Sequence, residues 1–244
     1  MKKILSVLTF SALMATGSYA DMTRVEMGAG AWMQTPSGSA NYNAVTPSSD
    51  TVDKTQKTSA YVWALVKHPI PVLPNLRAEY TNISSDGIAS GTWGTVTATG
   101  KSTLNMQQID LVPYYNLLDN TFWTTLDIGL DVKVIDMDFK VDATPSQYEY
   151  KKTLAVPMGY ARARVQIPST GIGLEADIKY VAYGSSSFSD TRAKIDYTFT
   201  SVPVVQPAIE VGYRTQKIKI DNSSADVKAD VDFSGFYTGL MLRF

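Results

Sequence analysis

The chain has 244 residues but no cysteine, and it contains a single histidine. Without cysteine, a disulfide framework, a thiol nucleophile and a cysteine-bound metal or lipid are all excluded. The one histidine, His68, leaves little material for the acid–base chemistry that hydrolytic enzymes commonly use. The spacings typical of zinc sites and of phosphate-cradling glycine loops are also missing. We therefore expect no cofactor, no metal site and no enzymatic activity.

Long hydrophobic runs are missing as well. After the first twenty residues, no stretch approaches the roughly 18 apolar residues that a transmembrane helix needs. The first twenty differ, because Lys2 and Lys3 precede an apolar stretch over 4–15 and a small-x-small triplet at 18–20. This order is typical of a secretory signal peptide, and the apolar stretch is too short to span a bilayer as a helix. The pattern predicts export and removal of the leader.

Neither sign of charge is in excess. The chain has 22 Lys and Arg against 23 Asp and Glu. Such a balance indicates no nucleic-acid partner. No linker or block of like charge divides the rest of the chain. We expect a signal peptide over 1–20 and one domain over 21–244, with an oligomeric state that the pattern does not define.

What the chain does contain is alternation of apolar and polar residues. The stretch TLDIGLDVKV (125–134) places leucine, isoleucine and valine on one face and charged or small residues on the other, because residues two apart in a strand share a face. YARARV (160–165) alternates in the same way and carries two arginines. Such segments predict about ten strands, near 23–34, 58–67, 75–84, 102–115, 122–140, 152–166, 172–183, 190–200, 205–219 and 228–244.

Two of these strands leave questions. In 122–140 the alternation changes phase between Val134 and Ile135, which predicts either a bulge or a strand that continues beyond a membrane. The strand over 58–67 is apolar on both faces, so its orientation stays open. If either segment is divided wrongly, eight or twelve strands fit the pattern instead of ten.

Short connections alternate with longer polar ones. The short, turn-forming ones cover 68–75, 116–120, 168–171 and 201–205. The longer ones cover 35–57, 85–101, 142–152, 185–190 and 221–228. This rhythm is typical of an outer-membrane β-barrel, whose turns face the periplasm and whose loops face outward. We predict an all-β protein, a closed antiparallel transmembrane β-barrel in a Gram-negative outer membrane.

In such a barrel the apolar face contacts lipid, and aromatic girdles lie near both interfaces. The aromatic residues predicted to form these girdles are Tyr80, Tyr115, Phe122, Tyr180, Tyr197, Phe199 and Tyr213. The last strand must pair with the first to remove free edges, so we expect Leu240, Leu242 and Phe244 to serve as a C-terminal assembly signal. The expected partners are outer-membrane lipid, lipopolysaccharide and the barrel-assembly machinery.

The polar face then lines the lumen. The residues predicted to point inward are Arg24, Glu26, Arg77, Glu79, Asp110, Asp127, Asp131, Lys133, Arg162, Arg164, Glu175, Asp177, Lys179, Arg192, Lys194, Asp196, Glu210, Arg214 and Arg243. Their signs nearly balance, and charges withdrawn from water need partners. About eight strands enclose a lumen that side chains just fill, and ten stay near that limit. We predict that ion pairs leave the lumen closed or narrow, in a protein with a structural or surface-interacting role.

Four segments carry a family resemblance: HPIPVLPN (68–75), DLVPYYNLLDN (110–120), LDIGLDVKV (126–134) and PMGYARARVQIPSTGIG (157–173). Together with the leader and the terminal GLMLRF, they resemble a family of small, functionally uncharacterised proteobacterial outer-membrane barrel proteins. The resemblance covers most of the chain after the leader. It implies a barrel fold and an outer-membrane location, and it brings no catalytic residue.

Three other functions stay open. A small-solute pore differs from a closed barrel only in the packing of its lumen. A soluble periplasmic ligand-binding barrel has the same alternation with the sides reversed. An enzyme would depend on His68, which lies in a predicted periplasmic turn, or on a carboxylate dyad of Asp127 and Asp131, for which an ion pair with Lys133 is the favoured interpretation. The acidic segment 221–232 lacks the spacing of a Ca²⁺-binding loop, which favours a solvated surface.

Overall fold

The computed structural model describes residues 23–42, 48–70, 72–93, 96–142, 147–199, 204–222 and 227–244. The predicted signal peptide, 1–20, lies outside these residues. Across the described ranges, no helix has the length and apolar character needed to cross a membrane.

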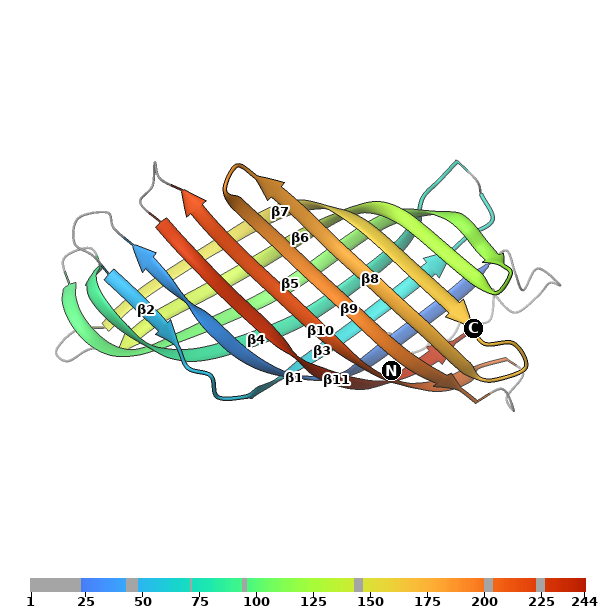
Figure 1. The fold of residues 1–244 in the computed structure, drawn as a ribbon, viewed down its shortest axis with the longest axis horizontal. Coiled ribbons are helices and arrows are strands. Elements are labelled where there is room, and N and C mark those ends of the chain that lie inside the picture. The colour runs from blue at the N-terminus through green and yellow to red at the C-terminus, as the bar shows by residue number, and fades with distance from the viewer. Residues whose placement is uncertain are drawn as a thin grey trace, which may run out of the picture.

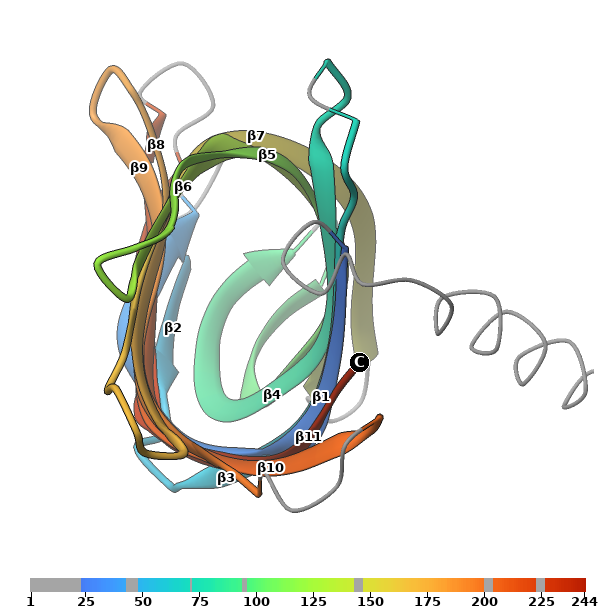
Figure 2. The ribbon, with the colours of Figure 1, turned by 90° about the vertical axis from the view of Figure 1, so that its right-hand side faces the viewer.

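All regular structure in the described ranges is strand. The strands are β1 (Arg24–Tyr42), β2 (Ser48–Val52), β3 (Lys57–Lys67), β4 (Asn75–Trp93), β5 (Val96–Thr121), β6 (Thr124–Asp142), β7 (Gln147–Gln166), β8 (Ile172–Tyr183), β9 (Ser186–Thr198), β10 (Gln206–Asn222) and β11 (Val227–Arg243). They form one sheet with antiparallel pairing of neighbours, and β11 pairs with β1 to close it. Figures 1 and 2 show the resulting barrel from the side and along its axis.

The barrel wall contains ten strands, because β2 and β3 are two segments of one. Both segments pair with β1 on one side and with β4 on the other. Between them, residues 53–56 leave the sheet and are exposed. At this break the Gln34 side-chain amide donates to the backbone oxygen of Ser84 at 2.9 Å, which links β1 directly to β4. The predicted number of ten strands is confirmed, and eight or twelve are excluded.

The strands extend further than the sequence pattern predicts. Residues 85–101 were expected as a loop, but β4 and β5 stay paired from the Asn75 end to Trp93 and Val96. β6 and β7 likewise pair as far as Asp142 and Gln147. The reason is that backbone hydrogen bonds hold these segments in the sheet, while their outward side chains are mostly polar, so the apolar outward face that marks the other strands is lost. Connection 116–120 lies inside β5, where the register with β6 shifts.

The predicted bulge near Val134 is absent from β6, whose register with β5 and β7 runs through this point unbroken. Odd-numbered residues point inward along the whole strand. What changes is chemistry, because the buried side chains are Asp131 and Lys133 before this point and Ile135 after it. The outward residues become charged, beginning with Asp136. The other alternative is therefore the correct one, a strand that continues beyond the membrane.

The outer face of the barrel carries a band of exposed apolar side chains. Leu130 is 66% exposed and Ile178 is 42% exposed, although both lie in the middle of paired strands. Exposed aromatic residues flank the band, as the predicted girdles require: Tyr115, Phe122, Tyr180, Tyr197, Phe199 and Tyr213, with Tyr80 half-buried. A barrel surrounded by water does not present an apolar patch of this extent. The band fits the hydrocarbon layer of a membrane.

The orientation of β3, which the sequence left open, follows from burial. Tyr61, Trp63 and Leu65 are buried inside the barrel, whereas Val62 faces outward and is 47% exposed. The turn after β3 is held by His68. Its Nδ1 accepts from the backbone N–H of Ile70 at 3.2 Å, and its Nε2 lies 3.0 Å from the carbonyl oxygen of Pro74.

A charge on the apolar band tests the orientation of the wall. We expect Leu130→Lys to lower the free energy of unfolding from lipid vesicles by about 2–4 kcal/mol, because the lysine enters hydrocarbon. Asp136→Lys on the same strand is the matched control and should stay within about 0.5 kcal/mol of the parent. Urea titration of the vesicle-embedded protein measures both. Equal effects would show that the two positions lie in the same solvent.

Candidate functional site: the charged lumen

The polar residues singled out from the sequence lie together inside the barrel. Apart from Arg24 and Arg243, which are partly exposed at one end, each is buried: Glu26, Arg77, Glu79, Asp110, Asp127, Asp131, Lys133, Arg162, Arg164, Glu175, Asp177, Lys179, Arg192, Lys194, Asp196, Glu210 and Arg214. Alternation along each strand aims them at the axis while their sequence neighbours face lipid. A buried charge of this kind requires an opposite partner.

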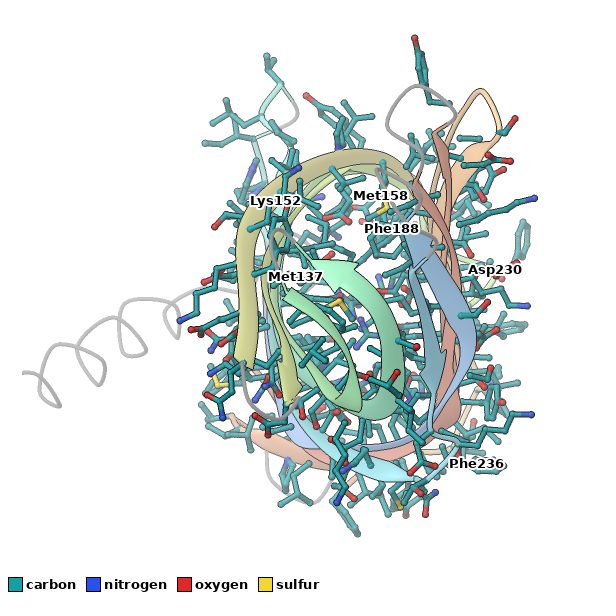
Figure 3. All side chains as sticks on the ribbon, turned by 90° about the vertical axis from the view of Figure 1, so that its left-hand side faces the viewer. Met137, Lys152, Met158, Phe188, Asp230 and Phe236 are labelled. Carbon is teal, nitrogen blue, oxygen red and sulfur yellow. The ribbon has the colours of Figure 1, made fainter. Side chains whose placement is uncertain are left out.

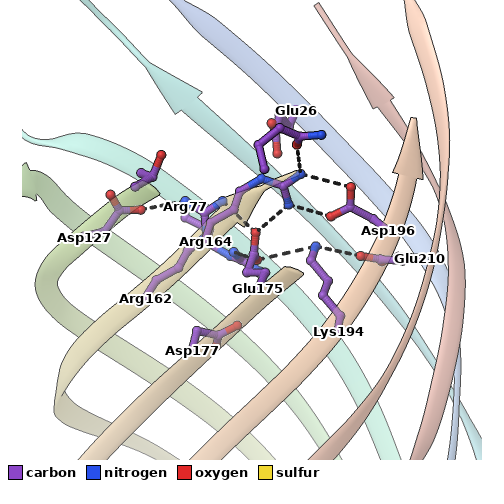
Figure 4. A network of polar contacts seen from close by, with 12 residues as sticks. Glu26, Arg77, Asp127, Arg162, Arg164, Glu175, Asp177, Lys194, Asp196 and Glu210 are labelled. Carbon is purple, nitrogen blue, oxygen red and sulfur yellow. Dashed lines mark hydrogen bonds and ion pairs between the residues drawn. The ribbon is translucent and has the colours of Figure 1, made fainter. Parts of the chain in front are cut away.

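The two arginines of YARARV supply such partners on β7. Arg162 donates from Nη1 to Asp127 Oδ2 at 2.6 Å and from Nη2 to Glu175 Oε2 at 2.7 Å. Arg164 donates from Nη1 to Asp196 Oδ1 at 2.5 Å and from Nη2 to Asp196 Oδ2 at 3.0 Å, a bidentate pair. Figure 4 shows these arginines joining carboxylates from β6, β8 and β9.

Glycine makes room for this arrangement. Gly173 faces the lumen on β8, and a Cβ atom there would overlap the guanidinium of Arg164 and lie 2.9 Å from Asp196 Oδ2. The Arg164 guanidinium, which forms the bidentate pair, therefore occupies the space that a side chain at position 173 would need.

Glu79 lies at the centre of the network. Its carboxylate is 2.5 Å from Arg77 Nε, 2.8 Å from Lys179 Nζ and 2.6 Å from Arg192 Nη2. These cations come from β4, β8 and β9, so one carboxylate links strands that are not neighbours in the sheet. Asp177 accepts from the same Nη2 of Arg192 at 2.9 Å and from its Nε at 3.1 Å.

A second group of pairs lies on the other side of Glu79 from Arg162 and Arg164. Lys133 Nζ is 2.5 Å from Asp110 and 3.1 Å from Asp190. Arg214 donates to both oxygens of Asp190, at 2.9 and 2.6 Å. Asp190 was not predicted, although it shares the parity of Arg192 and so the same face of β9. The predicted strand begins at this residue, but the clear alternation of apolar and charged residues begins only at Arg192.

Aromatic side chains complete the packing around Glu210. Tyr61 donates its hydroxyl to Glu210 at 2.7 Å, and the indole N–H of Trp63 donates at 3.2 Å. The Trp63 ring lies between two cations, 4.9 Å from Arg77 and 4.8 Å from Lys194. Such contacts are favourable when the cation is withdrawn from water. Sequence reasoning missed both aromatic residues because the orientation of their strand was unassigned.

Asp131 is the exception within the network. It is fully buried, and neither carboxylate oxygen has a hydrogen-bond partner among the described residues. The register places Val112 opposite it, so Asp110 is its diagonal neighbour on β5. Lys133 and Lys179 exert a field on Asp131, but both are ion-paired to Asp110, at 2.5 and 3.2 Å. The predicted pair between Asp131 and Lys133 therefore does not form.

Beyond the ion pairs, the lumen is lined by apolar side chains. Ile83, Met106, Ile135, Phe188 and Phe233 are buried there from five different strands. Figure 3 looks into this end of the barrel and shows Met137, Met158 and Phe188 on the inner side of the wall. The lumen thus has two zones, one ionic and one apolar.

The C-terminal end of β11 closes the barrel against β1. Phe244 exchanges backbone hydrogen bonds with Val25 at 2.9 and 3.4 Å, which closes the seam between β11 and β1. Leu240, Leu242 and Phe244 face outward and are 71%, 38% and 38% exposed.

The segment 221–232 is largely strand, since β10 ends at Asn222 and β11 begins at Val227. Within the described ranges, no group of three His, Cys, Asp or Glu is placed to hold a metal.

Two solved structures are similar to this barrel. The outer membrane protease OmpT from Escherichia coli aligns over 91% of this chain and 96% of its own, with 11% identity and a TM-score of 0.54. The translocator domain of the autotransporter NalP from Neisseria meningitidis aligns over 100% and 94%, with 13% identity and a TM-score of 0.45. No family model matches the chain, and no curated protein matches it. At such low identity the likeness to OmpT shows the fold alone, that of an outer-membrane β-barrel.

The likeness to OmpT corrects one expectation. We expected no enzymatic activity because the chain has no cysteine and one histidine, yet a barrel of this fold is a protease. The expectation is wrong because composition does not decide activity, which depends on the residues placed at a site on the fold. His68 itself is held in a turn.

Substitution of the two neighbouring aspartates separates a paired carboxylate from an unpaired one. Asp110→Asn should lower the free energy of unfolding by about 3–5 kcal/mol, because it leaves Lys133 and Lys179 short of a partner. Asp131→Asn should leave stability unchanged or raise it by about 1 kcal/mol, because it removes a buried carboxylate without a partner. Guanidinium unfolding in detergent, followed by tryptophan fluorescence, measures both. Equal losses would show that Asp131 is a paired anion.

Proposed function

We propose that this chain is an integral outer-membrane β-barrel whose lumen is closed to solutes, with a structural or surface-interacting role. The observation that carries the proposal is the set of ion pairs that cross the lumen. Lys179 on β8 meets Glu79 on β4 at 2.8 Å, and the Tyr61 hydroxyl on β3 meets Glu210 on β10 at 2.7 Å. Such contacts across the axis support a closed lumen, as the narrow bore of ten strands also favours.

The orientation in the membrane follows from the two ends of the wall. The end with the first residues of β1 and the last of β11 has short turns, and the other end extends beyond the apolar band in long polar hairpins. By the usual arrangement of such barrels, short turns face the periplasm and long hairpins face outside. The surface-interacting role therefore belongs to the hairpins.

Lipopolysaccharide fits the outer wall just beyond the apolar band. There Lys140 Nζ is 3.2 Å from Glu149 and Lys151 Nζ is 2.8 Å from the same carboxylate, with Asp138 beside them. These exposed charges of both signs match phosphorylated headgroups and the divalent ions that bridge them. The apolar C-terminal face of Leu240, Leu242 and Phe244 is the part that we propose the barrel-assembly machinery recognises.

Planar-bilayer recording tests the closed lumen. The parent protein should give no large, stable conductance that scales with salt. The double variant Glu79→Ala/Arg192→Ala should give conductance steps, because it removes two charged side chains from the centre of the lumen. Glu149→Ala on the outer wall is the control and should behave like the parent. A large conductance in the parent would instead establish the small-solute pore.

A further inference from the structure

Two hollows lie at the short-turn end of the barrel and share part of their lining. The first, of about 350 Å³, is lined by residues that include Arg24, Arg164, Gln166 and Arg243. The second, of about 300 Å³, shares Arg24, Arg164 and Gln166 with it and adds Lys67. Because both hollows meet at the same three side chains, they form one recess, which we call the vestibule. Figure 2 views the barrel from this end.

The lining of the vestibule is richer in cations than in carboxylates. Arg24, Lys67, Arg164 and Arg243 face it, whereas the acidic residues in its lining are Glu26 and Asp119. Arg164 and Arg243 also pair with Asp196, at 2.5 and 2.9 Å, but Asp196 is buried and does not line the vestibule. The surface offered to a solute is therefore positive, unlike the balanced network behind it.

One carboxylate oxygen serves two of these guanidinium groups. Glu26 Oε1 is 3.3 Å from Arg24 Nε and 3.2 Å from Arg243 Nε. Among the described residues, Glu26 is the single ion-pair partner of Arg24. The Arg24 side chain remains 29% exposed. A guanidinium has five N–H donors in a planar fork, so one distant oxygen leaves most of the Arg24 donors for another acceptor.

We propose that the vestibule is a binding site for a small oxyanion, a phosphate or carboxylate group, held by the fork of Arg24, with the positive charge of Arg243 beside it. The arginine fork matches two oxygens of such a group, and paired arginines are typical of phosphate and carboxylate recognition. Neutral polar residues in the same lining, Gln166, Thr170, Thr198 and Gln206, suit the uncharged part of the ligand. The site opens away from the long hairpins and does not require the lumen to be closed.

Calorimetric titration of the full chain in detergent with inorganic phosphate, and separately with succinate, tests the site. We expect saturable binding of at least one anion at low salt, and an affinity at least about tenfold weaker in Arg24→Gln, since this variant loses the charge-assisted hydrogen bonds to the anion. Lys217→Gln, an exposed cation near the opposite end, is the control and should bind like the parent. Absence of binding by the parent, or equal affinity in Arg24→Gln, would overturn the proposal.

Two further arms keep the test decisive. Arg24→Lys retains the charge without the fork, so it covers the case in which Arg24→Gln does not fold, and we expect it to bind more weakly than the parent. Parent-like affinity in Arg24→Lys would overturn the role of the fork. The same titration in phosphatidylglycerol vesicles and phosphatidylcholine vesicles decides the source of the oxyanion. Weaker phosphate binding in phosphatidylglycerol indicates that anionic lipid headgroups occupy the site, and equal binding indicates a soluble anion.

Discussion

The structure depends on one constraint: a strand that must face hydrocarbon with one side has to dispose of its polar side chains on the other. In a wall of ten strands that other side is a narrow lumen, where charges cannot be diluted by water. Buried cations are therefore placed against carboxylates, mostly those of other strands, as Arg162 is against Asp127 and Glu175. Ion pairing here is a condition of closing the barrel more than a source of net stability, since desolvation offsets much of the attraction.

The same constraint explains where the lumen changes character. Along β6, all the charged inward residues lie where outward residues face the apolar band, and the inward residues become apolar at Ile135, next to Asp136, the first charged outward residue. Past that level water lies outside the wall, so the barrel is organised as a soluble sheet is, with its apolar side turned in. One strand thus obeys two opposite rules in sequence, and its hydrogen-bond register is unaffected.

Alternating segments and the turn residues between them are enough to predict the strand number, and parity alone places most of the charged inward residues. Arg162 and Arg164 could be placed in the lumen with no knowledge of their partners. The partners themselves, such as Lys179 with Glu79, depend on register and on distance across the axis, which no local pattern contains. Trp63 was missed for a different reason: β3 is apolar on both faces, so alternation does not show which of its residues point inward. The unpaired state of Asp131 likewise depends on two lysines already held by Asp110.

The break between β2 and β3 has a consequence for how this wall can vary. Residues 53–56 leave the sheet, and the Gln34 amide bridges β1 to β4 where the ladder is interrupted. The Asp53 N–H still donates to the Asp86 carbonyl oxygen at 2.7 Å, but closure at this level does not rely on residues 54–56, so the chain there can lengthen without shifting the pairing of any neighbour. A barrel is usually extended only at its hairpin tips; this one has a lateral point of growth, at which an added segment would emerge from the side of the cylinder.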